Sequence, residues 1–227
     1  MPSDQAVAFS KSKRPANEPL AESLVELYAE APVPTRRGVL RFIVFREKGT
    51  EKEHVAVVKG DVRFQAEVPV RVHSECLTSE VFGSQKCDCR EQLDAAMDLI
   101  CASERGILIY LRQEGRGIGL GNKIRAYALQ AKGADTYEAN RALGFDDDLR
   151  RYDIAACMLK QLGVKSVQLI TNNPLKLSEL AALGVNVTRR IPSRVDGNAH
   201  SIGYLKTKRE RTGHLLDWLT GDEPLPE

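Results

Sequence analysis

The chain has 227 residues, of which 42% are hydrophobic and 28% are charged. These values are typical of a globular protein and exclude disorder over the whole length. The 33 basic and 31 acidic residues leave a formal net charge of +2, which excludes a general coating of nucleic acid and requires any polyanion site to be local.

The residues before position 35 mix proline, serine and charged side chains. They predict an N-terminal region over 1–34 that consists of a tail and a short helix over Leu20–Tyr28. One folded domain is predicted over 35–216 and a second tail over 217–227. From Thr35 to Arg71, short runs rich in Val, Ile and Phe predict antiparallel strands, with Pro69 at an edge or a strand start.

After Cys89 the apolar residues recur every three or four positions, which predicts a helix that ends at Gly106. Strands are then expected to alternate with helices, and the helix that follows TNNP has Asn173 as its N-cap and Pro174 in its first turn. The predicted fold class is therefore α+β, with an antiparallel first half and a mostly parallel second half. The later elements are expected as strands over 106–113, 167–170 and 185–190 and helices over 122–132, 149–162 and 174–184.

The chain is predicted to be a cytoplasmic protein without a membrane partner. Its purely apolar stretches, such as Ile107 to Leu111, have at most six residues and are too short for a bilayer. The N-terminal residues lack the apolar segment of a signal peptide. The five cysteines form an odd set, which argues against a disulfide framework.

Three of these cysteines, Cys76, Cys87 and Cys89, form a C-x10-C-x-C pattern. Thiolates one residue apart reach one ion only from a turn or extended backbone, because on a helix they would point about 200° apart. Three ligands leave one zinc position for water, which is the pattern of a catalytic site. The alternative is three unrelated buried thiols, and for Cys101 and Cys157 the role of small core residues is preferred.

Two further groups of residues have the composition of a site. His73 and Glu75 share one face of a strand and Cys76 points to the other, so His73 fits a substrate contact or a structural role better than metal ligation. The glycine-rich loop over 112–125 follows a strand and opens a helix, a context that favours phosphate over a solvated basic face. Its cations are Arg112, Arg116, Lys123 and Arg125.

Taken together, these motifs resemble the GTP cyclohydrolase II family, from about Thr35 to Leu216. The resemblance rests on RVHSECLTSEVFGSQKCDC, RQEGRGIGLGNKIRAYALQ, DTYEAN with LGFDDDLRRY, LITNNPLK and YLKTKRERTGHLL. It implies zinc-dependent hydrolysis of GTP, with Mg²⁺ at the phosphates, as the first step of riboflavin biosynthesis. The imidazole ring opens at C8, formate and pyrophosphate leave, and 2,5-diamino-6-ribosylamino-4(3H)-pyrimidinone 5′-phosphate remains. Family members are usually homodimers.

The resemblance also implies roles by position. Cys76, Cys87 and Cys89 match the zinc ligands. Tyr127 matches a catalytic tyrosine, Asp148 the general base and Arg150 the nucleophile toward the α-phosphate. From the residues alone, Asp146 and Asp147 are interpreted as caps of a following helix. Asp148 and Arg150 could act as a base and an anion partner, which their spacing does not decide. Substrate contacts are implied for Arg71, Val72, His73, Ser74, Glu75, Gln92, Glu114, Gly115, Arg116, Thr136, Thr171 and Lys176.

Some alternatives stay open at this level. Glu114 is the candidate acceptor for the guanine N–H groups, or it pairs with a loop arginine. Arg90 stands where the family commonly has glycine, which predicts an altered turn or an added anion contact. A related enzyme acting on another purine or pyrimidine, for example in uracil catabolism, would share these motifs. A zinc-stabilised nucleic-acid module is disfavoured by the near-neutral charge and the three-ligand site.

Overall fold

A mixed β-sheet organises the chain. The computed structural model describes residues 24–132, 141–145, 148–193, 195 and 215, and within them seven strands are ordered β1-β2-β3-β5-β4-β6-β7. Neighbours are antiparallel from β1 to β5 and parallel from β5 to β7, which confirms the α+β prediction. The strands are β1 (Val25–Thr35), β2 (Gly38–Glu47), β3 (Glu53–Lys59), β4 (Val68–Ser74), β5 (Gly106–Leu111), β6 (Val167–Ile170) and β7 (Val187–Ile191).

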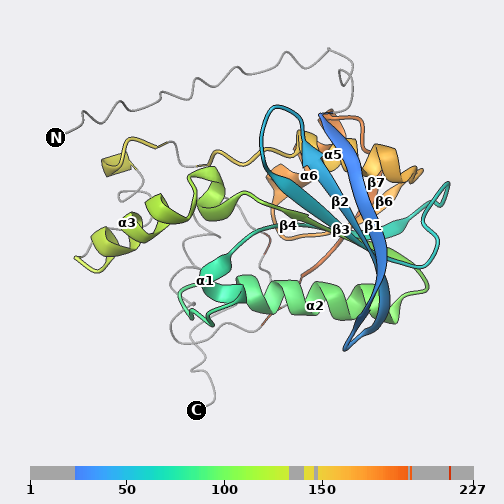
Figure 1. Cartoon of the computed structure of the whole chain (residues 1–227), viewed down its shortest axis with the longest axis horizontal. Coiled ribbons are helices and arrows are strands. Elements are labelled where there is room, and N and C mark those ends of the chain that lie inside the picture. The colour runs from blue at the N-terminus through green and yellow to red at the C-terminus, as the bar shows by residue number, and fades with distance from the viewer. Residues whose placement is uncertain (1–23, 133–140, 146–147, 194, 196–214, 216–227) are drawn as a thin grey trace.

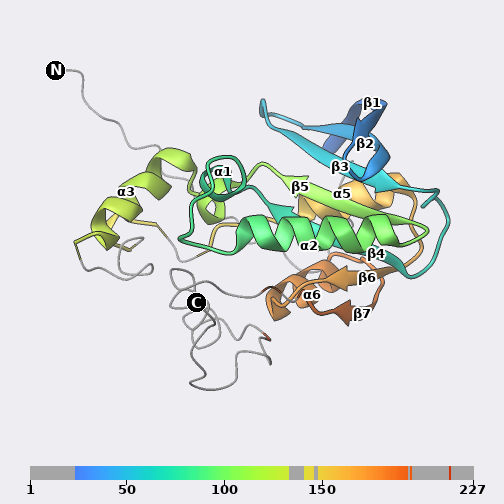
Figure 2. The ribbon, with the colours of Figure 1, turned by 90° about the horizontal axis from the view of Figure 1, so that it is seen from below.

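Helices cover both faces of this sheet, with α2 and α5 on opposite sides (Figure 1). Among the described residues, no helix combines the length and the apolar composition needed to cross a membrane. The helices are α1 (Leu77–Glu80), α2 (Cys89–Ala102), the 3-10 turn η1 (Glu114–Gly117), α3 (Leu120–Gln130), α5 (Asp153–Leu162) and α6 (Pro174–Ala182). Figure 2 shows α3 extending away from the sheet.

The two hydrophobic cores follow the alternation of side chains along the central strands. On β5, Ile107, Ile109 and Leu111 pack in the core shared with α5, whereas Leu108 packs in the core shared with α2. Successive residues of a strand point to opposite faces, so a continuous apolar run serves both cores. The prediction of a buried strand here is confirmed.

The predicted helix over Leu20–Tyr28 is wrong for the part that the structure describes. Val25 begins β1, which pairs with β2 from Val25↔Glu47 to Thr35↔Gly38. The hydrogen bonds of a neighbouring strand decide the conformation of this short segment, since an isolated helix of this length is marginal. Residues 25–34 thus belong to the sheet rather than to a tail.

Two predicted helix starts also move. α3 begins at Leu120 rather than at residue 122, and α5 begins at Asp153 rather than at 149. Leu149 does not enter the helix because its backbone N–H donates to the carbonyl of Arg116 (3.0 Å). The cap of α6 is as predicted, since the Asn173 side chain accepts from the Leu175 N–H and Pro174 occupies the first turn.

Gly106 begins β5 instead of closing α2, which ends at Ala102 with Ser103 as its cap. A Cβ at Gly106 would lie 3.0 Å from Cγ2 of Ile100 and 3.2 Å from the carbonyl oxygen of Pro69. The glycine therefore lets α2 pack closely on the sheet, which is a tertiary requirement.

Replacing Gly106 by alanine should lower the free energy of unfolding by about 1–3 kcal/mol, because the added methyl overpacks this contact. Urea unfolding at equilibrium would measure the change. Gly121→Ala is the matched control, since a Cβ there meets nothing within 4 Å and alanine is favoured in a helix. Equal stability of Gly106→Ala and the parent chain would contradict the packing argument.

Candidate active site

Three parallel strands, β5, β4 and β6, end at the same edge of the sheet. The segments that leave this edge are Glu75 and Cys76 after β4, Arg112 and Gln113 after β5, and Thr171 after β6. Ligand sites in sheets of this kind lie outside the carboxyl ends of the strands. Residues of the candidate site therefore meet here although they lie far apart in the sequence.

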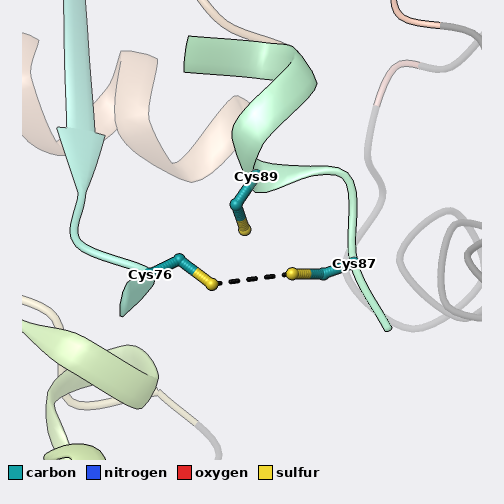
Figure 3. A group of neighbouring side chains, drawn as sticks. All are labelled: Cys76, Cys87 and Cys89. Carbon is teal, nitrogen blue, oxygen red and sulfur yellow. Dashed lines mark hydrogen bonds between the residues drawn. The ribbon is translucent and has the colours of Figure 1, made fainter. Parts of the chain in front are cut away.

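Three thiols converge beside this edge. Cys76 precedes α1, Cys87 lies in the turn before α2, and Cys89 is the first residue of α2. Their Sγ atoms all lie within 4.8 Å of one another, and those of Cys76 and Cys87 are 3.6 Å apart. Figure 3 shows the three side chains pointing toward a common point.

This geometry fits a tetrahedral thiolate-bound metal. Zn–S bonds of about 2.3 Å place neighbouring sulfur atoms about 3.8 Å apart, close to the separation of Cys76 and Cys87. Hydrogen bonds from Cys87 and Cys89 hold the pKa of the Cys76 thiol well below its usual range. The thiolate is the form of cysteine that binds metal. The lowered pKa therefore favours the metal-binding form at Cys76. This convergence favours one shared site over three unrelated thiols.

Lys123 of α3 reaches the cluster and bonds Glu114. Its Nζ donates to Cys76 Sγ (3.1 Å), to Thr78 Oγ1 (2.9 Å) and to Glu114 Oε1 (2.7 Å). Glu114 also accepts from the N–H of Leu77 at Oε2 (2.6 Å) and from the N–H of Gly115 at Oε1 (2.9 Å). Glu114 thus pairs with a lysine of the following helix, rather than with a loop arginine.

The glycine-rich loop brings a second segment to the site. Gly115 and Arg116 have positive φ angles of 62° and 60°, a conformation that a non-glycine residue adopts only under strain. A Cβ at Gly117 would lie 2.9 Å from the carbonyl oxygen of Leu149. Glycine at 117 therefore permits the close approach of the segment that contains Asp148 and Arg150.

Asp148 and Arg150 form a bidentate ion pair, in which Arg150 bonds both carboxylate oxygens. Nε of Arg150 donates to Oδ1 (2.9 Å) and to Oδ2 (3.1 Å) of Asp148. Burial alone would raise the pKa of Asp148, but the hydrogen bonds from Arg150 outweigh it and the pKa is lowered. Asp148 is therefore a carboxylate at neutral pH, as a general base must be.

A series of hydrogen bonds connects the sheet to the turn that contains Cys87 and Cys89. Arg71 on β4 donates from Nη1 to the carbonyl of Ile170 (3.1 Å) and from Nη2 to Oε1 of Gln92 (2.5 Å). Nε2 of Gln92 donates to Oδ2 of Asp88 (2.5 Å), the residue between Cys87 and Cys89. Burial lowers the pKa of Arg71. Arg71 and Gln92, both expected as substrate contacts, thus also support the cysteine turn.

His73 lies outside the thiol cluster, as the alternation along β4 predicts. Its Nε2 is 2.7 Å from Oε1 of Glu80, and its ring stacks on Tyr110 with the centroids 5.8 Å apart. The Tyr110 hydroxyl donates to Oε2 of the same carboxylate. Burial lowers the pKa of His73. Glu80 and Tyr110 are not predicted from the sequence as partners of His73. The four residues of α1 show no periodicity that would place Glu80, and Tyr110 lies on a strand distant in sequence.

The remaining residues with implied roles lie on both sides of the cluster. The Val72 carbonyl accepts from Lys176 Nζ (2.9 Å), Ser74 Oγ accepts from Gln113 Nε2 (3.0 Å), and Glu75 pairs with Arg112 (2.9 Å). The structure therefore places Val72, Ser74 and Glu75 in hydrogen bonds with neighbouring segments.

Thr171 and Tyr127 belong to different segments, after β6 and on α3. Thr171 follows β6 and its hydroxyl oxygen accepts from the Asn173 N–H (3.0 Å). The Tyr127 ring lies 5.7 Å from Lys123 Nζ, and burial raises the pKa of Tyr127 to about 12. Its hydroxyl is therefore protonated at neutral pH and can donate. Thr136 lies outside the residues that the structure describes.

Arg90 connects the two helices that follow the cysteines. Its Nη1 donates to the carbonyl of Glu80 (2.6 Å), its Nε pairs with Asp94 (2.9 Å), and its backbone N–H donates to Ser79 Oγ (3.2 Å). These bonds place its guanidinium between α1 and α2. In the described part of the chain, Arg90 therefore bonds groups of α1 and α2, and both roles expected for it stay predictions.

This arrangement defines an α+β protein with three cysteines that could hold a metal ion at the carboxyl edge of its parallel strands. Residues 26–192 match the family model described as GTP cyclohydrolase II. The chain belongs to the GTP cyclohydrolase II family of metal-dependent enzymes.

Curated relatives agree with this assignment. The chain is 52% identical to GTP cyclohydrolase-2 of Tolumonas auensis over 86% of this chain and 98% of that protein. It is 50% identical to GTP cyclohydrolase-2 of Picrophilus torridus over 85% of this chain and 100% of that protein. It is 51% identical to the riboflavin biosynthesis protein RibBA of Bacillus subtilis over 86% of this chain and 49% of that protein. The chain thus spans about half the length of the RibBA proteins that it matches.

Among solved structures, the two-domain 3,4-dihydroxy-2-butanone 4-phosphate synthase RibBX of A. baumannii is similar with a TM-score of 0.45 and 20% identity, over 80% of this chain and 43% of that chain. That likeness is too distant to bear on the chemistry of the site.

The ion pair of Asp148 and Arg150 gives a testable pH dependence. Because the folded pKa of Asp148 is lowered, the pair stabilises the folded chain above the unfolded pKa of about 3.9 and loses this effect as the pH falls through the folded value. Carboxyl ¹³C NMR should show a midpoint below about 3.9 for Asp148. Arg150→Leu should move this midpoint upward, whereas Arg151→Leu, which removes the neighbouring arginine, should leave it in place. An unchanged midpoint in Arg150→Leu would refute the assigned cause.

Proposed function

We propose that this chain hydrolyses GTP, opening the imidazole ring at C8 and releasing formate and pyrophosphate to give 2,5-diamino-6-ribosylamino-4(3H)-pyrimidinone 5′-phosphate, the first step of riboflavin biosynthesis. The observation that carries the proposal is the convergence of Cys76, Cys87 and Cys89 at the carboxyl edge of the sheet. Family membership and the names of full-length relatives support the reaction.

The metal is proposed to be Zn²⁺, held by the three thiolates, with Mg²⁺ at the substrate phosphates. The all-sulfur ligand set favours zinc over harder divalent ions. When bound in a three-ligand site, zinc supplies Lewis acidity that activates water at neutral pH. The spacing of the sulfur atoms supports this choice.

The chain's own residues are proposed to bind and orient GTP. Glu114 is the proposed acceptor for guanine N–H groups. Oε2 of Glu114 accepts one hydrogen bond among the described residues, from the Leu77 N–H, and a carboxylate oxygen accepts two. The backbone around Gly115 and the Arg116 side chain are proposed to contact the triphosphate, together with Thr136, Thr171 and Lys176.

Asp148, Arg150 and Tyr127 are the proposed catalytic residues. The lowered pKa of Asp148 keeps its carboxyl group ionised at neutral pH, so that its oxygens carry no proton and are open to one. Its direct bond to Arg150 puts a proton acceptor on the guanidinium proposed to attack the α-phosphate. The raised pKa of Tyr127 suits a hydroxyl that donates rather than one that ionises.

We further propose that the protein acts as a cytoplasmic homodimer on GTP, without nucleic-acid or membrane partners. Mass spectrometry of the products formed from GTP with zinc and magnesium tests the reaction. The expected result is formate, pyrophosphate and the ring-opened pyrimidine monophosphate. Full zinc occupancy without formate from GTP would overturn the proposal, and activity of the same kind on another purine or pyrimidine nucleotide would assign the chain to a related enzyme.

Cys87→Ser should lower zinc content from about one ion per chain to a small fraction and abolish formate release, because a serine hydroxyl is a poor zinc ligand at neutral pH. Elemental analysis and a formate assay measure the two effects. Cys101→Ser is the control, since Cys101 lies on α2 among partly buried core residues. Formate release by zinc-free Cys87→Ser at the parent rate would refute the metal's role.

A further inference from the structure

The hydrogen bonds of Lys123, on α3, differ from those expected of a lysine in the basic segment over 112–125. Its ammonium is buried, with the residue 8% exposed. An ammonium has three donors, and those of Lys123 are taken by Cys76 Sγ, Thr78 Oγ1 and Glu114 Oε1. A lysine with this many internal partners is poorly placed to bind a phosphate. Its place among the cations of the glycine-rich loop predicts a phosphate contact, and these bonds do not favour one.

The charges around Lys123 explain why a cation is needed there. A divalent metal with three thiolates carries one net negative charge, and the Glu114 carboxylate adds another. Both groups are largely buried, since Cys76 is 4% and Glu114 is 7% exposed. Buried charges without a partner are strongly destabilising. Lys123 is hydrogen-bonded to both groups at once.

The same lysine connects the cluster to the glycine-rich loop. Glu114 is the first residue of η1, and its Oε2 accepts from the N–H of Leu77, the residue after Cys76. The carboxylate is therefore held between Lys123 and the backbone next to a metal ligand.

We propose that Lys123 is a positioning residue: it is the counter-ion of the three-cysteine centre and couples metal loading to the orientation of Glu114. The inference rests on the proposed function in so far as zinc is the metal and Glu114 the guanine acceptor. Lys123 is neither a metal ligand nor a residue that touches the reacting atoms. Lys123 acts through the Cys76 thiolate and the Glu114 carboxylate.

The test measures zinc affinity directly, by competition with a chromophoric chelator at constant pH. Lys123→Met, which keeps the length of the side chain and removes the charge, should weaken zinc binding about 10- to 100-fold, the usual effect of losing a partner of a metal ligand. Lys123→Arg should recover most of this loss. Lys132→Met is the control for removing a lysine, because Lys132 is exposed just beyond α3, and it should bind zinc as the parent does.

A spectroscopic signature separates this role from a general structural one. In the cobalt-substituted protein, loss of the hydrogen bond to Cys76 raises the energy of the thiolate electrons, so the sulfur-to-cobalt charge-transfer band of Lys123→Met should move to lower energy. The band should not move in Lys132→Met. Where Lys123→Met fails to fold by circular dichroism, Lys123→Gln provides the same comparison without the charge.

Parent-like zinc affinity together with an unshifted cobalt band in Lys123→Met or Lys123→Gln would overturn the inference. This outcome differs from failure of the proposed function. Failure of the function appears in the parent protein, as absence of zinc binding or of formate from GTP.

Discussion

The parallel pairing of β4 with β5 and β6 is the constraint on which the site depends. It brings the carboxyl ends of three strands to one edge, so that the segments after Ser74, Leu111 and Ile170 become neighbours. A site needs side chains of different types within a few ångströms, and consecutive residues rarely provide them. The buried apolar strands hold this edge in place, because each is packed on both faces.

The polar side chains near this edge are arranged in buried groups in which each charge has a partner. Arg71 bonds Gln92, and Gln92 bonds Asp88 in the cysteine turn. Glu80 bonds both His73 and Tyr110, and Lys123 bonds both Cys76 and Glu114. Partnered polar groups of this kind restrict a buried site to one arrangement, which matters where sulfur atoms must hold a metal at defined distances.

Several residues serve the fold and the proposed chemistry together. Gly117 allows the loop to approach Leu149, and this contact places Asp148 and Arg150 beside the loop. Arg150 lowers the pKa of Asp148 by direct hydrogen bonds. Arg90 of α2 joins its helix to α1 by donating to the carbonyl of Glu80. A substitution at these positions changes both packing and the charge of the site.

The sequence by itself determined the features that depend on local physics. These include the buried strand before the loop, the Asn173–Pro174 cap of α6, the α+β class, and the grouping of three cysteines as one candidate metal site. Only the tertiary structure decided the partner of Glu114, the role of Gly106 and the strand over Val25–Tyr28. Those outcomes depend on groups distant in the chain: a lysine on a separate helix, the isoleucine that packs on Gly106, and the neighbouring strand β2. Local propensity cannot encode them, because the hydrogen bonds and close contacts that decide them exist only after the chain has folded.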